Sequence, residues 1–133
     1  MSSGISEQVQ RFLGQHITSI EQLEVLLLLR RTEEREWNAA AVAREIGSSM
    51  MSMHDRLAGL ASRGLLVARE DSEDILYRYA PTTDETRRTV DDLAKAYKER
   101  RLSIINLIYA KPPPSDIQSF SEAFRITKKG GEG

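Results

Sequence analysis

Apolar residues recur every three or four positions along most of the chain, which is the spacing of amphipathic helices. The pattern predicts a short helix over residues 6–15 and a second helix from about residue 20 to residue 31. The second helix has so wide an apolar surface that much of it should be buried. Thr18 and Ser19 are each followed three residues later by an acidic or amide side chain, so either can cap this helix.

Two helices separated by a glycine are predicted in the middle of the chain. Asn38 is a favourable N-cap for the first helix, and Ser49 is one for the second, which covers residues 50–63. Gly47 supplies the turn between them, where a residue with a Cβ would be strained. The side chains expected to face the core from this pair are Ala39, Val42, Ala43, Ile46, Met50, Met53, Leu57, Leu60 and Ala61.

A β-hairpin is predicted after the helix pair. Residues 65–69 and 75–80 are rich in β-branched and aromatic side chains, and the polar residues 71–74 between them are typical of a turn. Pro81 ends the second strand. Trp37 is predicted to form a very short strand ahead of the helix pair and to pack beneath the hairpin.

The last third of the chain predicts one long helix from Asp84 to about Lys111, capped by Thr82 or Thr83. Its length would be roughly 40 Å at about 1.5 Å per residue. A run of three prolines ends it, and a further short helix is predicted over residues 116–127.

Length and composition fit a single soluble folded domain. The chain has 133 residues, of which 40% are hydrophobic and 29% charged, and its net charge is −1. A core over residues 18–80 and an extension over 82–128 are the expected parts of this domain. The near-neutral charge does not favour non-specific binding of nucleic acid, for which a basic chain is the usual sign.

Several classes of chemistry are not expected. The chain has no cysteine and only two histidines, His16 and His54, so neither a disulfide nor a zinc site is predicted. It shows no glycine-rich phosphate loop and no nucleophile elbow, so no enzyme activity and no cofactor are predicted. No secretory signal or membrane-spanning apolar segment is visible, which makes a cytoplasmic location the default.

The order helix, glycine, helix and hairpin over residues 18–80 resembles bacterial winged-helix regulators of the MarR type. The residues that carry the resemblance are Ala43, Gly47 and the phrase Leu60-Ala-Ser-Arg-Gly-Leu-Leu66. The resemblance implies an α+β fold, mainly α, with a winged helix-turn-helix and with terminal helices that form a homodimer. It also implies that the second helix of the motif enters a DNA major groove.

The residues predicted to contact DNA are unusual for that role. Bases are commonly read by Arg, Lys, Asn or Gln, whereas the exposed start of the second motif helix offers a methionine, two serines, a histidine and an aspartate. The end of the hairpin carries four acids within residues 70–74, which would repel phosphate. The predicted DNA-contacting set is Ser49, Met51, Ser52, His54, Asp55, Arg69 and Arg78.

The long C-terminal helix predicts a dimer interface. A helix of that length exceeds what a domain this small can cover, although its apolar seam could also pack on its own domain. A symmetric pair would bury the remainder. The predicted interface residues are Phe12, Val90, Leu93, Tyr97, Ile104, Leu107, Ile108, Phe120 and Phe124.

Two functions remain open from the sequence. The first is a homodimeric, DNA-binding transcription regulator, with double-stranded DNA and a second copy as partners and room for a small-molecule or protein effector. The second is a winged-helix adaptor for protein–protein interaction with little or no DNA binding. The acidic hairpin favours the adaptor, and the resemblance favours the regulator.

Overall fold

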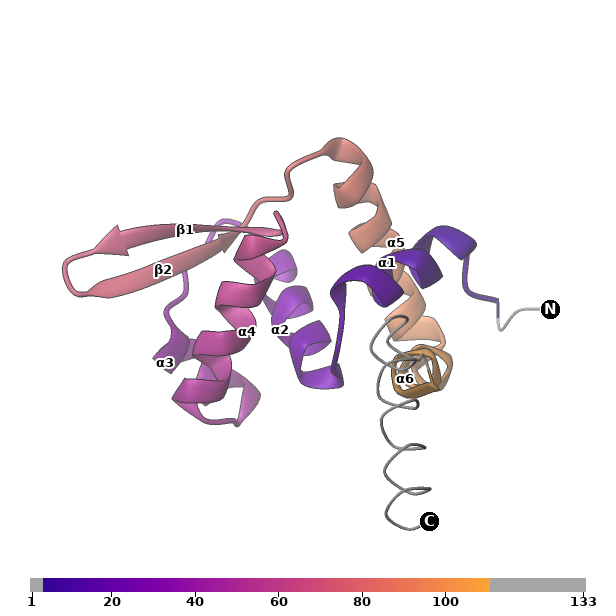
Figure 1. The fold of residues 1–133 in the computed structure, drawn as a ribbon, viewed down its shortest axis with the longest axis horizontal. Helices are drawn as coiled ribbons and strands as arrows, with labels where there is room; N and C mark the ends of the chain where they lie inside the picture. The colour runs from indigo at the N-terminus through magenta and orange to yellow at the C-terminus, as the bar shows by residue number, and fades with distance from the viewer. Residues whose placement is uncertain (1–3, 111–133) are drawn as a thin grey trace, which may run out of the picture.

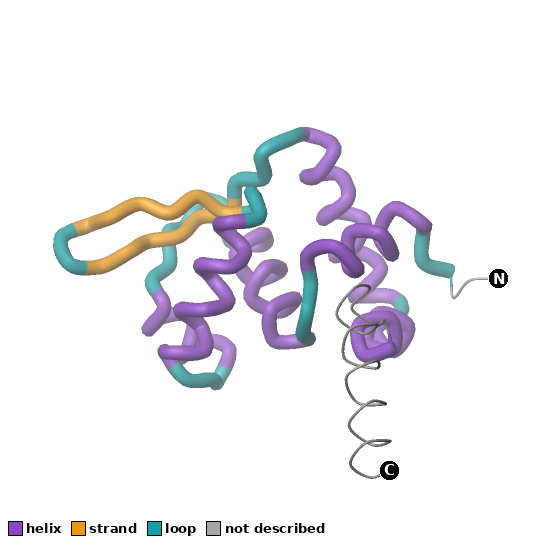
Figure 2. The backbone as a smooth tube through the Cα atoms, viewed as in Figure 1, coloured by secondary structure: helices purple, strands orange, loops and turns teal. Residues whose placement is uncertain are grey.

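The computed structural model describes residues 4–110, which form six helices and one two-stranded hairpin (Figure 1). The elements are α1 (Glu7–His16), α2 (Ile20–Arg31), α3 (Ala39–Ile46), α4 (Met50–Ser62), β1 (Leu66–Asp71), β2 (Asp74–Tyr79), α5 (Asp84–Glu99) and α6 (Arg101–Ala110). The hairpin projects from one side of the helices, as the strands in Figure 2 show. The mainly helical winged helix-turn-helix fold is therefore confirmed.

The start of each central helix is fixed by the side chain that the sequence indicated. Ser19 caps α2 by accepting a hydrogen bond from the N–H of Gln22, and Asn38 caps α3 by accepting one from the N–H of Ala41. Gly47 ends α3 with a φ of 85°, a left-handed conformation that explains the glycine.

The hairpin is longer than predicted. In the register of β1 and β2, Leu66 lies opposite Tyr79 at one end and Asp71 lies opposite Asp74 at the other. The acidic segment therefore belongs to the strands, and only two residues form the loop. Trp37 makes an isolated bridge with Tyr77, and each of the two N–H groups donates to the other residue's carbonyl at 2.8 Å. Trp37 is buried beneath the hairpin, which confirms its predicted packing role.

The prediction of one continuous helix after the hairpin is wrong. α5 ends at Glu99, and Arg100 leaves the helical conformation with φ −137° and ψ 56°. Figure 1 shows α6 almost end-on and α5 lengthwise, so the two helices point in different directions. Residues 98–101 are all charged and exposed, so no buried side chain at the bend holds the two helices in one line.

The bend places the apolar seam inside the same protomer. α1 packs against both α5 and α6. The seam residues that are buried in the common core are Val90, Leu93, Ile104 and Ile108, together with Phe12 of α1. These five side chains therefore need no second copy to cover them, contrary to the expectation from a single long helix. The predicted helix over residues 116–127, with Phe120 and Phe124, lies outside the described residues.

The core of the helix-turn-helix follows the predicted apolar stripe with one exception. Met53, Leu57 and Leu60 of α4 have no exposed surface, and Val42 of α3 is equally buried. Met50 was expected beside them but is 59% exposed. It is the first residue of α4, and this turn extends beyond the edge of the core.

Candidate nucleic-acid interface

The first turn of α4 is an exposed helix start on a rigid support. The Ser49 hydroxyl accepts a hydrogen bond from the N–H of Ser52 at 3.0 Å, which confirms Ser49 as the predicted cap. Capping satisfies one of the N–H groups that a helix start leaves unpaired, while the helix dipole keeps this end partially positive. Such an end favours anionic ligands.

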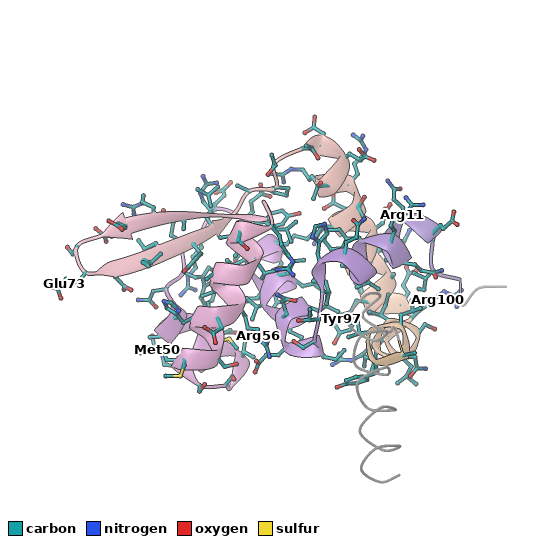
Figure 3. The ribbon with its side chains drawn as sticks, in the orientation of Figure 1. Arg11, Met50, Arg56, Glu73, Tyr97 and Arg100 are labelled. Carbon is teal, nitrogen blue, oxygen red and sulfur yellow. The ribbon has the colours of Figure 1, made fainter. Side chains whose placement is uncertain are left out.

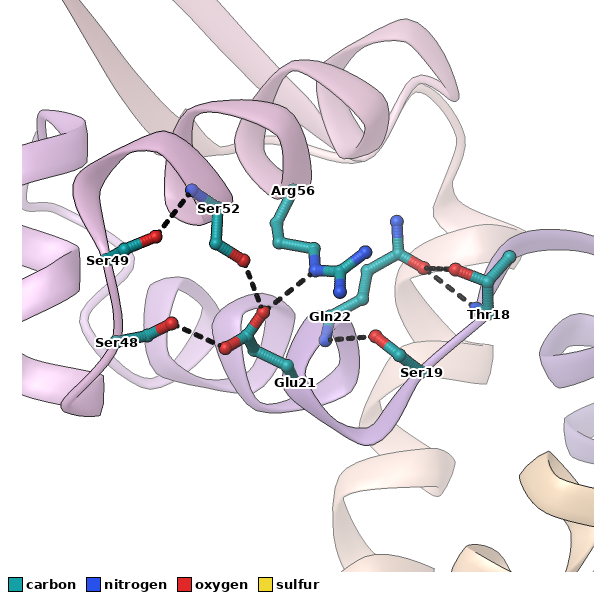
Figure 4. A network of polar contacts seen from close by, with 8 residues as sticks. All are labelled: Thr18, Ser19, Glu21, Gln22, Ser48, Ser49, Ser52 and Arg56. Carbon is teal, nitrogen blue, oxygen red and sulfur yellow. Dashed lines mark hydrogen bonds and ion pairs between the residues drawn. The ribbon is translucent and has the colours of Figure 1, made fainter.

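A single carboxylate joins α2 to this helix start (Figure 4). Glu21 accepts hydrogen bonds from the hydroxyls of Ser48 at 2.6 Å and Ser52 at 2.7 Å, and from Nε of Arg56 at 3.0 Å. The bonds from Ser48, Ser52 and Arg56 hold the pKa of Glu21 below its usual value. Glu21 thus fixes the turn and the first half of α4 against α2.

This role of Glu21 was missed by sequence reasoning. Its position three residues after Thr18 suggested a capping box, but the amide of Gln22 accepts from the Thr18 N–H instead. The partners of Glu21 lie 27 to 35 residues away along the chain. Only the folded chain shows this network.

The outward face of α4 carries little positive charge. Met51 is 77% exposed, and His54 and Asp55 are exposed beside it. The Ser52 hydroxyl is occupied by Glu21, so of the predicted α4 residues only Met51, His54 and Asp55 are free to meet a ligand with their side chains. Arg56 points inward to Glu21, and its side chain is 31% exposed.

Arg69 and Arg78 lie apart from the first turn of α4, although Arg69 lines a hollow with Ala58 and Ala61 farther along that helix. In the hairpin register Arg69 lies opposite Leu76, and Arg78 lies opposite Val67, which places both arginines on the outer side of the hairpin. The buried Leu66 and Tyr77 occupy the inner side, toward α4. The sequence could not reveal this, because side-chain alternation depends on the observed register.

Arg69 is also engaged by another residue. Its Nε and Nη2 donate to the two carboxylate oxygens of Glu36 at 2.8 and 2.7 Å. The hydrogen bond between them lowers the pKa of Glu36 and raises that of Arg69. Arg78 is exposed and makes no ion pair within the described part of the chain.

A cation that sequence reasoning overlooked lies on α3. Arg44 is exposed, and among residues 4–110 it forms no ion pair. It is near the C-terminal end of the first helix of the motif, the helix that crosses the DNA backbone in helix-turn-helix complexes.

The end of the hairpin is acidic and partly fixed. Glu70, Asp71 and Glu73 are exposed, and Figure 3 shows Glu73 at the far end of the loop. Asp74 accepts a hydrogen bond from Nδ2 of Asn38 at 2.7 Å, which ties the start of β2 to the cap of α3. A phosphate backbone at this end would meet like charge.

The predicted dimer residues divide into three groups. Phe12, Val90, Leu93, Ile104 and Ile108 are buried within the protomer. Tyr97 and Leu107 are half-buried, and Phe120 and Phe124 lie outside the described residues.

Two apolar side chains that were not predicted are exposed on α6 instead. Leu102 is 73% and Tyr109 is 74% exposed. Large apolar side chains at such exposure on one short helix offer a surface for another protein.

Other kinds of site have no support within residues 4–110. No group of three or more His, Asp or Glu side chains there could hold a metal ion. None of the helices described is long and apolar enough to cross a membrane.

The fold matches solved winged-helix regulators. One is the homodimeric winged helix-turn-helix DNA-binding domain of Mb0332 from Mycobacterium bovis, a possible ArsR-family transcriptional regulator. The two sequences are 25% identical, the match covers 74% of this chain and 92% of that chain, and the TM-score is 0.53. Another is NolR from Sinorhizobium fredii, with 20% identity, 67% and 84% of the two chains covered, and a TM-score of 0.51.

A third match was solved with DNA. It is a mutant of the transcription regulator MepR from Staphylococcus aureus, bound to an oligodeoxyribonucleotide, with 13% identity, 92% of this chain and 87% of that chain covered, and a TM-score of 0.53. No model of a known protein family matches the chain, and no curated protein sequence matches it. The structural matches confirm the predicted resemblance to winged-helix transcription regulators.

Proposed function

We propose that the protein is a homodimeric transcription regulator that binds double-stranded DNA with the start of α4 and acts in the cytoplasm without an enzymatic step. The observation that carries this proposal is the exposed first turn of α4, capped by Ser49 and held by Glu21 in a winged-helix frame. The same frame occurs in the DNA complex of the MepR mutant.

The side chains of α4 define what such a contact would read. Met51 offers an apolar contact, which suits the methyl group of thymine, and Asp55 can accept a hydrogen bond from the exocyclic amine of cytosine. Phosphates would be held by the free N–H groups of the first turn and by Arg44 on α3. Arg78 would reach only phosphates that flank the hairpin, and Arg69 would first have to leave Glu36.

So few cations imply a weak dependence of affinity on salt. With about two phosphate contacts in each protomer, a dimer would neutralise about four phosphates, and a plot of log affinity against log salt would have a slope of about −4. Regulators that rely on a basic wing would show a steeper slope. Specificity would then depend more on apolar base contacts than on charge.

The dimer is supported by the exposed apolar side chains of α6. Leu102 and Tyr109 would pack on the same helix of a second copy, in continuity with the half-buried Leu107. Two-fold pairs are the commonest oligomers. The two α4 helices of such a pair would lie about 34 Å apart and enter successive major grooves.

The test is a selection from a random library of duplex DNA with the full-length protein at a stated salt concentration. The proposal expects an inverted repeat whose half-sites are centred about 10 base pairs apart. An adaptor, which the acidic hairpin supports, predicts no enrichment at any salt concentration. An enriched duplex that binds equally well after Met51→Ala and His54→Ala are combined would exclude contact through α4.

A further inference from the structure

A hollow lies where the starts of α3 and α4 approach the hairpin. Its volume is about 470 Å³, and it is lined by Ala39 and Ala40 of α3 and by Met50, Met51 and His54 of α4. The two methionines are 59% and 77% exposed, so the walls are apolar side chains that face solvent. Methionine adapts its shape readily and is common on surfaces that bind other proteins.

Hydrogen bonds within the protein hold the edge of the hollow in place without a ligand. The Asn38 side chain accepts from the N–H of Ala41 at 2.8 Å and donates to Asp74 at 2.7 Å. One amide therefore joins the start of α3 to the start of β2. A site whose shape is already held costs less conformational entropy to occupy than one that must be ordered on binding.

Charge around the hollow is divided between its two sides. The hairpin side carries Asp74 at the edge, followed by Glu73, Asp71 and Glu70. Figure 3 shows Glu73 at the end of the hairpin and Met50 on the helices below it.

The helix side carries one arginine, one histidine and one acid. Its charged and titratable groups are His54 in the lining, Asp55 beside it, and Arg44 one turn after Ala40. A ligand in the hollow thus meets a mainly acidic hairpin and an apolar floor.

We propose that this hollow docks a basic amphipathic segment of another protein. Bulky apolar side chains of the segment, such as leucine or phenylalanine, would fill the space between Met50 and Met51, and its lysines or arginines would face the hairpin acids. Duplex DNA fits this position less well, because its phosphates would approach Glu73 and Asp74. The inference goes beyond DNA binding and does not require it.

Docking would have a consequence for the proposed regulator. Met51 and His54 belong both to the hollow and to the face of α4 assigned to DNA, so the segment and the duplex would exclude each other. Binding of the segment would then release DNA without any change in the fold.

The test is a selection of peptides from a random displayed library against the full-length protein in the absence of DNA. Enriched peptides are then synthesised with a fluorescent label and titrated by anisotropy. The key variant combines Met50→Gln with Met51→Gln, which alters only exposed side chains. The matched control is Val67→Thr, an exposed apolar residue on the outer face of the hairpin.

The proposal expects enriched peptides that combine apolar anchors with lysine or arginine. The double methionine variant should bind them about tenfold more weakly, as for the loss of a central anchor, and Val67→Thr should change affinity less than about twofold. Neutralising Glu73 by Glu73→Gln should weaken binding mainly at low salt.

Three outcomes would overturn the proposal. They are the absence of any enriched peptide, enriched peptides without basic residues, and equal binding by the double methionine variant. If only DNA uses this face, the double methionine variant should no longer bind the selected duplex, and the library should yield no enriched peptide. The peptides are titrated without DNA, so a negative result would not bear on the regulator proposal. That proposal is tested separately by the selection of duplex DNA.

Discussion

Replacing Glu21 by glutamine tests the network that holds α4 in place. The carboxylate accepts from Ser48 at 2.6 Å, Ser52 at 2.7 Å and Arg56 at 3.0 Å. Glutamine has almost the same shape, but it is neutral and keeps only one acceptor oxygen. The Glu21→Gln variant therefore loses the charge without opening a cavity, and one serine hydroxyl must turn to accept from the new amide instead of donating.

The exposed fractions of the Glu21 and Arg56 side chains limit how much free energy of unfolding the substitution can remove. A hydrogen bond to a charged group contributes about 1.5–3 kcal/mol when it is well buried. The side chains of Glu21 and Arg56 are 29% and 31% exposed, so water screens their ion pair, and exposed pairs contribute about 0–1 kcal/mol. We therefore expect Glu21→Gln to lower the free energy of unfolding at neutral pH by about 1–3 kcal/mol.

The direction of the pKa shift of Glu21 decides how its contribution to stability changes with pH. The folded state lowers the pKa of Glu21 below the usual 4.5, so the unfolded state binds a proton first as the pH falls. The stabilisation by Glu21 is complete above the usual pKa and is lost as the pH falls through the folded pKa. A protonated Glu21 resembles glutamine, so the difference between wild type and variant should shrink in that range.

Urea unfolding at several pH values measures this difference. The matched control is Glu45→Gln on α3, which removes an exposed carboxylate that has no ion pair within the described residues. Its effect should stay within about 0.5 kcal/mol. A Glu21→Gln effect no larger than that of the control, or one that persists unchanged at low pH, would refute the role given to Glu21.

Three further predictions concern the core, the dimer and the hairpin. Leu57→Ala should lower the free energy of unfolding by about 2–5 kcal/mol in urea melts, because the fully buried side chain leaves a cavity. Leu102→Glu should yield a folded monomer by light scattering, and a wild type that is already monomeric at tens of micromolar would contradict the proposed dimer. Neutralising Glu70, Asp71 and Glu73 with amides should leave affinity for a selected duplex equal or higher in anisotropy titrations, most clearly at low salt. Loss of binding would mean that these acids contact the duplex or hold the hairpin.

Local features of the fold could be predicted from the sequence because their causes are local. Asn38 and Ser49 cap their helices through hydrogen bonds that span three residues, and Gly47 meets a backbone requirement at its own position. Periodicity also identified Leu57 as core. These signals depend on neighbours along the chain, which the sequence shows directly.

The features that could not be predicted depend on distant contacts. Glu21 finds its partners 27 to 35 residues away, and Arg69 is bound to Glu36 across the hairpin. The bend at Arg100 has no local signal, because Lys, Glu and Arg all favour helix, and α5 and α6 both pack against α1. That the start of α4 and the two hairpin arginines contact DNA stays a prediction, although the ion pair of Arg69 with Glu36 now has to be counted against Arg69.

The most direct test of the proposed function is to map a selected duplex onto the protein by NMR. Backbone amide shifts of the isotope-labelled full-length chain would be followed during a DNA titration at fixed salt. We expect the largest changes over residues 49–55 at the start of α4 and at Arg44, with small changes at Glu73 in the hairpin loop. Changes centred on the hairpin loop, or no changes at all with a duplex recovered by selection, would contradict it.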